Sequence, residues 1–170
     1  MKMSEMKIRA GVLTVSDKGA AGQRKDLSGA ALKELLTALP AEVARYGIVP
    51  DELEQIRGTL TAWCDRDRLD LIITTGGTGF SPRDVTPEAT AGIIERPTPG
   101  LSEAIRLESL KKTPHGMLSR AVSGIRGRTL IINLPGSERA VRESFAVIAP
   151  ALPHALETLT GRGGECGGGP

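Results

Sequence analysis

Residues 71–88 read LIITTGGTGFSPRDVTPE, and three signals within them indicate the fold class. The apolar run 71–75 is too short for a buried helix and ends at Gly76 and Gly77, which indicates a strand. It lacks alternation, as strands covered on both faces do. The stretch closes with Thr86-Pro87-Glu88, where a cap, a proline and an acidic residue predict the start of a helix. A strand, a glycine loop and a helix in this order predict one unit of an α/β fold.

Two other runs of the chain have the same character. Residues 8–15 (IRAGVLTV) end at Ser16-Asp17, and residues 130–134 (LIINL) end at Pro135-Gly136. Residues 42–49 alternate better between apolar and polar side chains, which predicts a strand nearer the edge of the sheet. The chain is therefore expected to hold several short strands, most of them buried on both faces.

Amphipathic helical patterns separate these predicted strands. They cover residues 27–36, 53–63 and 99–112, and a last region from residue 141 in which Pro150 and Pro153 must end, kink or restart the helix. Strands that alternate with helices predict a three-layer α/β/α architecture with a mostly parallel sheet. Residues 121–134 differ, because two short β-prone pieces flank residues 124–127. This pattern predicts a small β-hairpin near the C-terminal third.

Length and composition predict a single domain. The chain has 170 residues, of which 39% are hydrophobic and 25% are charged. A chain of this size and composition can bury a core, so complete disorder is excluded. Residues 161–170 include six glycines and predict a flexible tail that follows one domain over residues 1–160.

Charge and residue usage exclude several classes of partner. Lys and Arg number 22 against 20 Asp and Glu, a net charge of +2 without a basic stripe, which argues against a nucleic-acid surface. The chain has one Trp, one Tyr and two Phe, too few for base stacking. No signal peptide and no apolar run near 18 residues is found, so we expect a cytoplasmic protein without membrane association. Cys64 and Cys166 lie in different settings and predict neither a disulfide nor a metal site.

The loop after residue 75 is a candidate site, because ligands of open α/β sheets bind beyond the carboxyl ends of the strands. Its glycines would let backbone N–H groups approach an anion, Arg83 offers a fork for phosphate, and Asp84 offers a hard ligand for Mg²⁺. The candidate residues of this loop are Thr75, Gly76, Gly77, Thr78, Gly79, Ser81, Arg83 and Asp84. The alternative is a glycine turn with a solvated Arg–Asp pair. The patterns G-x-x-x-x-G-K-[ST] and G-x-G-x-x-G are absent, which disfavours a Walker-type loop and a dinucleotide oxidoreductase.

The ends of the first and second predicted strands offer further ligands. Ser16 and Asp17 could contact a nucleotide, and the alternative is an Asx-turn at Asp17 with a helix cap at Asp26. Asp51 follows the second strand. It is either the N-cap of the next helix or a carboxylate that shares a divalent metal with Asp84.

The third loop, Pro135-Gly136-Ser137, is a glycine turn into a helix N-terminus and suits anion binding, unless Ser137 only caps the helix. Ser119 and Arg120 place a hydroxyl and a guanidinium just before the predicted hairpin, where the alternative is plain surface. His115 and His154 are isolated from each other and from other ligands. Neither histidine predicts a metal site or a catalytic triad.

Together these motifs resemble the molybdopterin-binding family of MogA/MoaB type, which includes the gephyrin G domain. The matching segments are residues 49–52 (VPDE), 74–79 (TTGGTG), 83–90 (RDVTPEAT), 99–100 (PG), 118–120 (LSR) and 134–137 (LPGS). The likeness runs from Ile8 to Leu159, and the segments agree in order and spacing.

The resemblance implies a trimeric α/β protein that acts late in molybdenum cofactor synthesis. Such enzymes adenylylate molybdopterin with Mg-ATP and release pyrophosphate. The resemblance places the two essential aspartates of the family at Asp51 and Asp84 and the glycine loop at residues 76–79. It places the pterin near Ser119 and residues 135–137. It also implies a later molybdenum-insertion protein as a partner.

Two alternatives to this activity stay open. The chain continues past residues 134–137 without the insertion of the longer MogA form, as shorter MoaB-type members do. Some MoaB-type members are doubtful adenylyltransferases, so a non-catalytic molybdopterin-binding or assembly module is the first alternative. A nucleotide phosphohydrolase that uses the same loop is the second.

Overall fold

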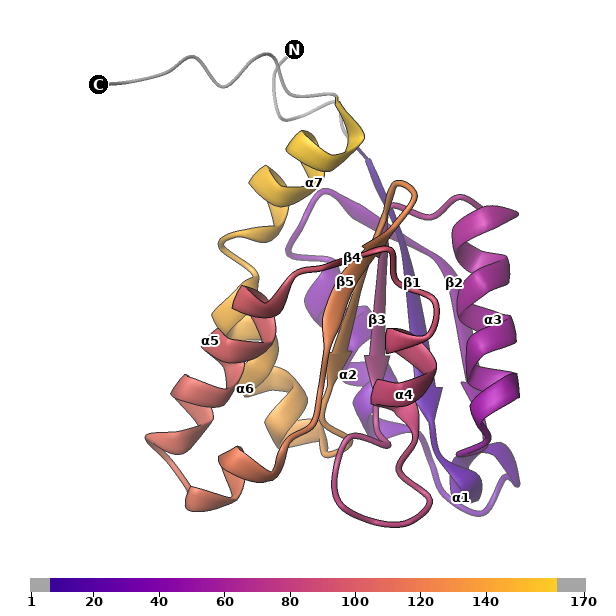
Figure 1. Ribbon diagram of the computed structural model, residues 1–170, viewed down its shortest axis with the longest axis vertical. Helices are drawn as coiled ribbons and strands as arrows, with labels where there is room; N and C mark the ends of the chain where they lie inside the picture. Colours follow the sequence, from indigo (N-terminus) through magenta and orange to yellow (C-terminus); the bar gives the residue numbers. More distant parts are fainter. Residues whose placement is uncertain (1–6, 162–170) are drawn as a thin grey trace.

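The computed structural model describes residues 7–161, and within them six strands form one sheet between two layers of helices (Figure 1). The strands are β1 (Ile8–Val15), β2 (Ala41–Val49), β3 (Leu71–Thr75), β4 (Arg96–Pro97), β5 (Ser123–Arg126) and β6 (Thr129–Leu134). The helices are α1 (Asp17–Ala20), α2 (Leu27–Leu36), α3 (Leu53–Asp65), α4 (Thr86–Ala91), α5 (Pro99–Leu110), the 3-10 helix η2 (Pro114–Leu118), α6 (Glu138–Ile148) and α7 (Leu152–Thr160). The predicted three-layer architecture is confirmed. The predicted tail lies outside the described residues, apart from Gly161.

The larger part of the sheet is parallel, and its strand order is β2-β1-β3-β6-β5-β4. β1 pairs in parallel with β2 and β3, and β3 pairs in parallel with β6. β4 and β5 add two antiparallel strands at one edge. The carboxyl ends of the four parallel strands therefore meet at one edge of the sheet, the lower edge in Figure 1. Among the described helices, none combines the length and apolar character needed to cross a membrane.

The predicted hairpin is confirmed, but its turn lies two residues later than expected. β5 and β6 pair with Arg126 opposite Thr129, so Gly127 and Arg128 form the turn and residues 124–126 belong to the strand. Gly127 has a φ of 56°, a conformation that glycine adopts without the strain a side chain would add. The two-residue strand β4 was not predicted, because so short a segment has no periodic pattern.

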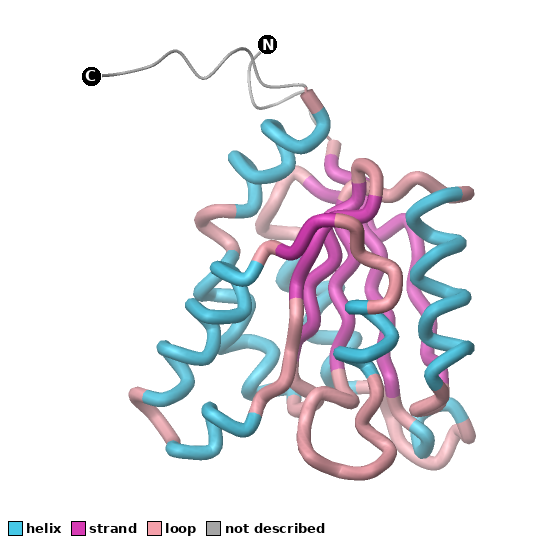
Figure 2. Tube along the Cα trace, viewed as in Figure 1, coloured by secondary structure: helices cyan, strands magenta, loops and turns pink. Residues whose placement is uncertain are grey.

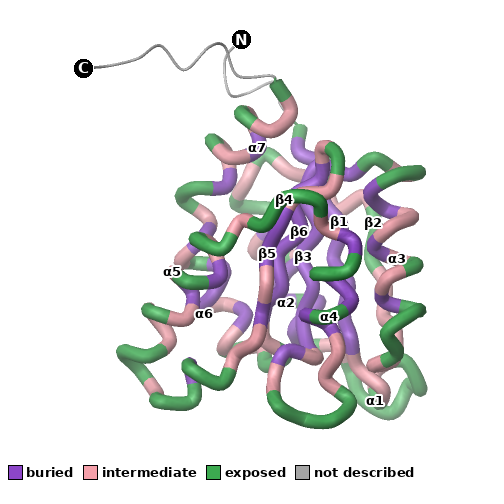
Figure 3. The backbone as a smooth tube through the Cα atoms, viewed as in Figure 1, coloured by how far each residue is buried: buried purple, intermediate pink, exposed green. Residues whose placement is uncertain are grey.

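Each face of the sheet has its own apolar core (Figure 3). On one face, α2, α5, α6 and α7 cover side chains of β1, β3 and β6; members of this core include Leu32, Ile73, Ile132, Phe145 and Leu156. On the other face, α3 and α4 cover a second core, whose members include Leu13, Ile56, Leu60, Trp63, Ile72 and Ile131. Two covered faces explain why the strands β1, β3 and β6 lack alternation.

Two predicted helix caps are wrong by one residue, and both corrections concern the candidate site. The N-cap of α4 is Val85, and the Thr86 hydroxyl instead donates to the carbonyl of Gly76 (2.9 Å). The N-cap of α3 is Glu52, whose side chain forms no capping bond. Asp51 is thereby available for contacts beyond the helix.

Prolines and side-chain caps account for other helix ends. Pro150 follows the end of α6, and Pro153 lies in the first turn of α7, so the last helical region ends and restarts as the prolines predicted (Figure 2). Asp26 and Ser137 cap α2 and α6 by accepting bonds from backbone N–H groups. Each of these two residues thus has the capping role that was considered for it.

Candidate functional site

A cavity of about 640 Å³ lies where the parallel strands end. Eight of the predicted residues line it: Ser16, Asp51, Thr75, Gly76, Gly77, Asp84, Gly136 and Ser137. Six predicted residues lie around the cavity without lining it: Asp17, Thr78, Gly79, Ser81, Arg83 and Arg120. Ser119 and Pro135 line a separate cavity of about 230 Å³. We call the larger cavity the carboxylate cavity and the smaller one the η2 cavity.

The glycine loop after β3 is held by tight contacts with neighbouring strand ends. Gly76 has a φ of 99°, and a Cβ atom built on it would overlap the carbonyl oxygen of Val15. The N–H of Gly76 donates to the carbonyl of Leu134 (3.1 Å), which ties the loop to the end of β6. Gly77 has a φ of 66°, and a Cβ atom there would overlap the Thr86 hydroxyl. The loop therefore needs glycine at both positions.

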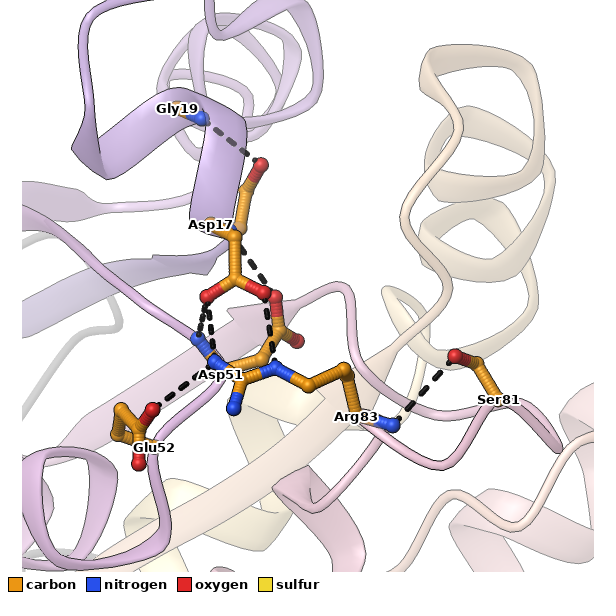
Figure 4. A network of polar contacts seen from close by, with 7 residues as sticks. Asp17, Gly19, Asp51, Glu52, Ser81 and Arg83 are labelled. Atoms are coloured by element: carbon orange, nitrogen blue, oxygen red, sulfur yellow. Dashed lines mark hydrogen bonds and ion pairs between the residues drawn. The ribbon is translucent and has the colours of Figure 1, made fainter.

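Asp51 and Asp17 join the ends of β1 and β2 (Figure 4). The Asp51 carboxylate accepts the N–H of Asp17 (2.9 Å), and the Asp17 carboxylate accepts the N–H of Asp51 (3.0 Å). Arg83 donates to both oxygens of Asp17 (3.1 and 2.9 Å) and to Glu52 (2.9 Å). Arg83 thus fastens the glycine loop to these two strand ends. The paired guanidinium lowers the pKa of Asp17.

Asp84 lies at the far end of the same loop and shapes it locally. Its carboxylate accepts the N–H of Ser81 (3.1 Å), and its own N–H donates to the carbonyl of Ser81 (2.9 Å). A Cβ atom on Gly79 would lie 2.9 Å from the Asp84 carboxylate, so the glycine leaves room for it. Asp84 therefore has a fixed orientation beside the cavity wall.

Two carboxylates, those of Asp51 and Asp84, thus face one cavity, and the charge of Asp84 affects the ionisation of Asp51. Burial raises the pKa of Asp51, and the negative charges of Asp17 and Asp84 raise it further. The hydrogen bond from the Asp17 N–H lowers this pKa, but by less than burial raises it. In the part of the chain that the structure describes, no three His, Cys, Asp or Glu side chains cluster as a metal site. Two carboxylates with space for phosphate oxygens and water are a donor set that fits Mg²⁺, which keeps several non-protein ligands.

Arg120 clamps the backbone of the glycine loop. Its Nε donates to the carbonyl of Gly79 (2.8 Å), its Nη2 to the carbonyl of Asp84 (2.7 Å), and its Nη1 to Glu88. Its own N–H donates to the carbonyl of Thr78 (2.9 Å). The guanidinium is engaged by the loop rather than open to a ligand, and its hydrogen bond to Glu88 lowers the pKa of that carboxyl group.

The third loop closes against the glycine loop. The Thr75 hydroxyl donates to the carbonyl of Pro135 (2.7 Å), and a Cβ atom on Gly136 would lie 3.2 Å from the Cα of Gly76. Ser16 caps α1 on the other side of the site by accepting the N–H of Gly19 (3.0 Å). The three loops predicted from the sequence thus form one wall.

The η2 cavity lies between α5, η2 and α6 and is mainly apolar. Ile105, Ala121 and Val147 line it together with Ser119 and Pro135. Because Pro135 borders this cavity and Gly136 borders the carboxylate cavity, the two spaces are separated by one loop.

Several cavity residues were not predicted, and most of them belong to the segment between α1 and α2, to the start of α2 or to β1. They are Thr14, Val15, Gly19, Arg24, Lys25, Leu27, Ser28 and Glu138. Asp26, considered only as a helix cap, also lines the cavity and accepts bonds from Thr14 (2.7 Å) and Tyr46 (2.6 Å). Burial alone would raise the pKa of Asp26, but the bonds from Tyr46 and Thr14 lower it overall. The adjacent basic residues at 24 and 25 were the available signal.

Comparisons with known proteins agree with this geometry. Residues 11–154 match the model of a family described as a probable molybdopterin binding domain. The chain is 43% identical over 157 residues to the molybdopterin adenylyltransferase of Helicobacter pylori, with 91% of this chain and 89% of that protein covered. It is 50% identical over 153 residues to the molybdenum cofactor synthesis protein cinnamon of Drosophila melanogaster, with 89% of this chain covered.

The fold comparison gives the same result. The crystal structure of the molybdopterin biosynthesis enzyme MoaB from Thermus thermophilus superposes with a TM-score of 0.87 at 55% identity, covering 91% of this chain and 97% of that one. The chain spans 26% of the Drosophila protein and 22% of Dictyostelium discoideum gephyrin, to which it is 45% identical. It therefore corresponds to one part of those longer proteins.

Proposed function

The chain belongs to the molybdopterin-binding domain family, and from this we propose that it transfers the adenylyl group of ATP to molybdopterin during molybdenum cofactor biosynthesis. The observation that carries the proposal is the placement of Asp51 and Asp84 on one cavity beside the glycine loop. Adenylyltransferases that match most of this chain at 38–43% identity support it.

The reaction requires that two polyanions meet in line. An oxygen of the terminal phosphate of molybdopterin attacks the α-phosphorus of ATP, and a new P–O bond forms. The bond from this phosphorus to the oxygen that bridges to the β-phosphate breaks, and its electron pair leaves with pyrophosphate. A phosphate monoester is largely ionised near neutral pH, so no strong base is needed. Positioning and charge neutralisation have to supply the acceleration.

The residues of the carboxylate cavity suit these two tasks. The N–H group of Gly77, which lines the cavity, donates to no protein acceptor within residues 7–161 and is available to phosphate oxygens. Asp51 and Asp84 would hold Mg²⁺, which when bound neutralises phosphate charge. Arg83 and Arg120 keep the loop in the geometry that presents these groups.

The η2 cavity would take the pterin end of molybdopterin. Ser119 offers a hydroxyl there, and the apolar wall suits a planar ring system. The loop 135–137 would then lie between the pterin and the reacting phosphate. We also propose that the protein is a cytoplasmic homotrimer that passes its product to a molybdenum-insertion protein.

Pyrophosphate release in the presence of Mg-ATP and molybdopterin tests the function. We expect release by the wild type, loss of turnover in Asp84→Ala with molybdopterin binding largely intact, and wild-type turnover in the control Asp65→Ala, an exposed aspartate at the far end of α3. Molybdopterin binding without release would favour a non-catalytic module. Release of pyrophosphate or AMP without molybdopterin would favour a phosphohydrolase. Wild-type turnover in Asp84→Ala would refute the assignment of the metal site.

A further inference from the structure

The two arginines among the predicted site residues, Arg83 and Arg120, already bind protein partners. Arg83 is bound to Asp17 and Glu52, and Arg120 is bound to Glu88 and to loop carbonyls. All three donor nitrogens of Arg120 have partners, and two of those of Arg83 do. A guanidinium has five N–H donors, and each of these arginines uses three of them on the protein, which leaves fewer for phosphate oxygens. Their contribution is therefore to the shape of the loop.

Arg24 and Lys25 are different, because they line the carboxylate cavity and are exposed. Within residues 7–161, neither side chain forms an ion pair or a hydrogen bond with the protein. Their backbone is nevertheless anchored. The N–H of Gln23 donates to the carbonyl of Lys18 (2.8 Å), and the N–H of Leu27 donates to the carbonyl of Lys25 (3.1 Å). The segment thus presents two free cations from a held backbone.

The other charges on the cavity wall are accounted for. Glu138 pairs with Arg142 (3.2 Å), and Asp26 accepts the hydroxyls of Thr14 and Tyr46. Asp51 and Asp84 remain as the metal-binding pair of the proposed function. Arg24 and Lys25 are then the only lining cations among the described residues, and nothing in that part of the chain neutralises them.

We propose that Arg24 and Lys25 bind the β- and γ-phosphates of ATP and stabilise the pyrophosphate that leaves. This inference rests on the proposed function, which puts the α-phosphate beside Asp51 and Asp84. The two outer phosphates must extend from there along the wall, and the electron pair of the broken P–O bond adds charge to the β-phosphate. Fixed cations beside that charge favour bond breaking as well as binding. The two residues would therefore act on ATP and not on AMP.

Calorimetry of nucleotide binding by the full chain, in the presence of Mg²⁺, tests whether the two residues act on ATP and not on AMP. We expect the double variant Arg24→Ala/Lys25→Ala to bind ATP about 10- to 100-fold more weakly than the wild type, since each lost charge-assisted contact accounts for about tenfold. AMP affinity should change by less than about twofold, because AMP lacks both phosphates. Lys18→Ala is the matched control, because Lys18 is an exposed lysine of α1 that does not line the cavity. It should bind ATP as the wild type does.

A second pair of variants separates charge from shape. Arg24→Lys/Lys25→Arg keeps both charges and should retain most of the ATP affinity, whereas Arg24→Gln/Lys25→Gln should lose it. Unchanged ATP affinity in the alanine and glutamine variants would overturn the proposal, and so would an equal loss for ATP and AMP. If the wild type binds ATP and these variants bind it with the same affinity, this inference is refuted and the proposed function is not. A wild type that binds no ATP refutes the proposed function together with it.

Discussion

Replacing Gly76 by alanine should damage both stability and activity. A side chain at a φ of 99° costs about 1 kcal/mol or more in backbone strain. The new Cβ also overlaps the Val15 carbonyl oxygen, a backbone atom that cannot rotate away. Relief requires the loop to move, which breaks the bonds of Gly76 with Leu134 and Thr86, each worth about 1 kcal/mol. We therefore expect a loss of about 3 kcal/mol.

Gly127→Ala is the matched control for this variant. Gly127 also has a positive φ, 56°, but a Cβ there meets no atom within 4 Å. This control should lose only about 1 kcal/mol, the strain itself. For a domain of this size the two losses correspond to a fall in Tm of about 6–12 °C for Gly76→Ala and about 2–4 °C for the control. Thermal unfolding followed by circular dichroism measures both.

Pyrophosphate release completes the comparison. Moving the glycine loop shifts Asp84 and the free N–H group of Gly77, so Gly76→Ala should lose most of its turnover at temperatures where it is still folded. Gly127→Ala should turn over as the wild type does, because its hairpin turn is remote from the cavity. If the two variants lose the same stability, the close approach of Gly76 to Val15 does not constrain the loop, and the reasoning is refuted.

Three further substitutions or titrations test other contacts. Burial raises the pKa of Asp51, so folding favours the protonated carboxyl group, and this stabilisation is lost as pH rises through the folded-state pKa. Asp51→Asn should therefore be at least as stable as the wild type at neutral pH, while losing turnover. A Tm below that of the wild type at pH 7 would contradict this expectation. Tyr46 is the only tyrosine of the chain, and burial together with its bond to Asp26 raises its pKa to about 12. Phenolate absorbance should report that value, and Asp26→Asn should lower it, whereas an ordinary value in the wild type would count against the bond. Thr75→Val removes the 2.7 Å bond to the carbonyl of Pro135 and should cost about 1–2 kcal/mol in urea unfolding, and an unchanged midpoint would show that the bond does not hold the two loops together.

The buried strands could be predicted from the sequence because their signals are local. β1 and β3 begin and end where the apolar runs 8–15 and 71–75 do, since turn residues follow each run directly. β4 and α1 could not be predicted, because segments of two and four residues are too short to show periodicity. Their structure depends on pairing with distant segments.

The site was predictable to the extent that topology determines it. Asp51 and Asp84 reach one cavity because parallel strands end at one edge of the sheet. The partners of Arg83 were not predictable, because Asp17 lies 66 residues away and several acidic residues could have competed for the arginine. The choice among them depends on the loop conformation, which the sequence pattern does not describe.

The position of β6 has a consequence for synthesis of the protein. β6 inserts between β3 and β5, although more than fifty residues separate it from the end of β3 in the chain. A nascent chain that has not reached Thr129 therefore exposes the unpaired edge of β3, which can recruit other strands and invites aggregation. Gly76 also has no Leu134 carbonyl to bind at that stage. Chains released before Thr129 would lack β6 and the loop after it, and could not form the carboxylate cavity, whose wall includes Gly136 and Ser137.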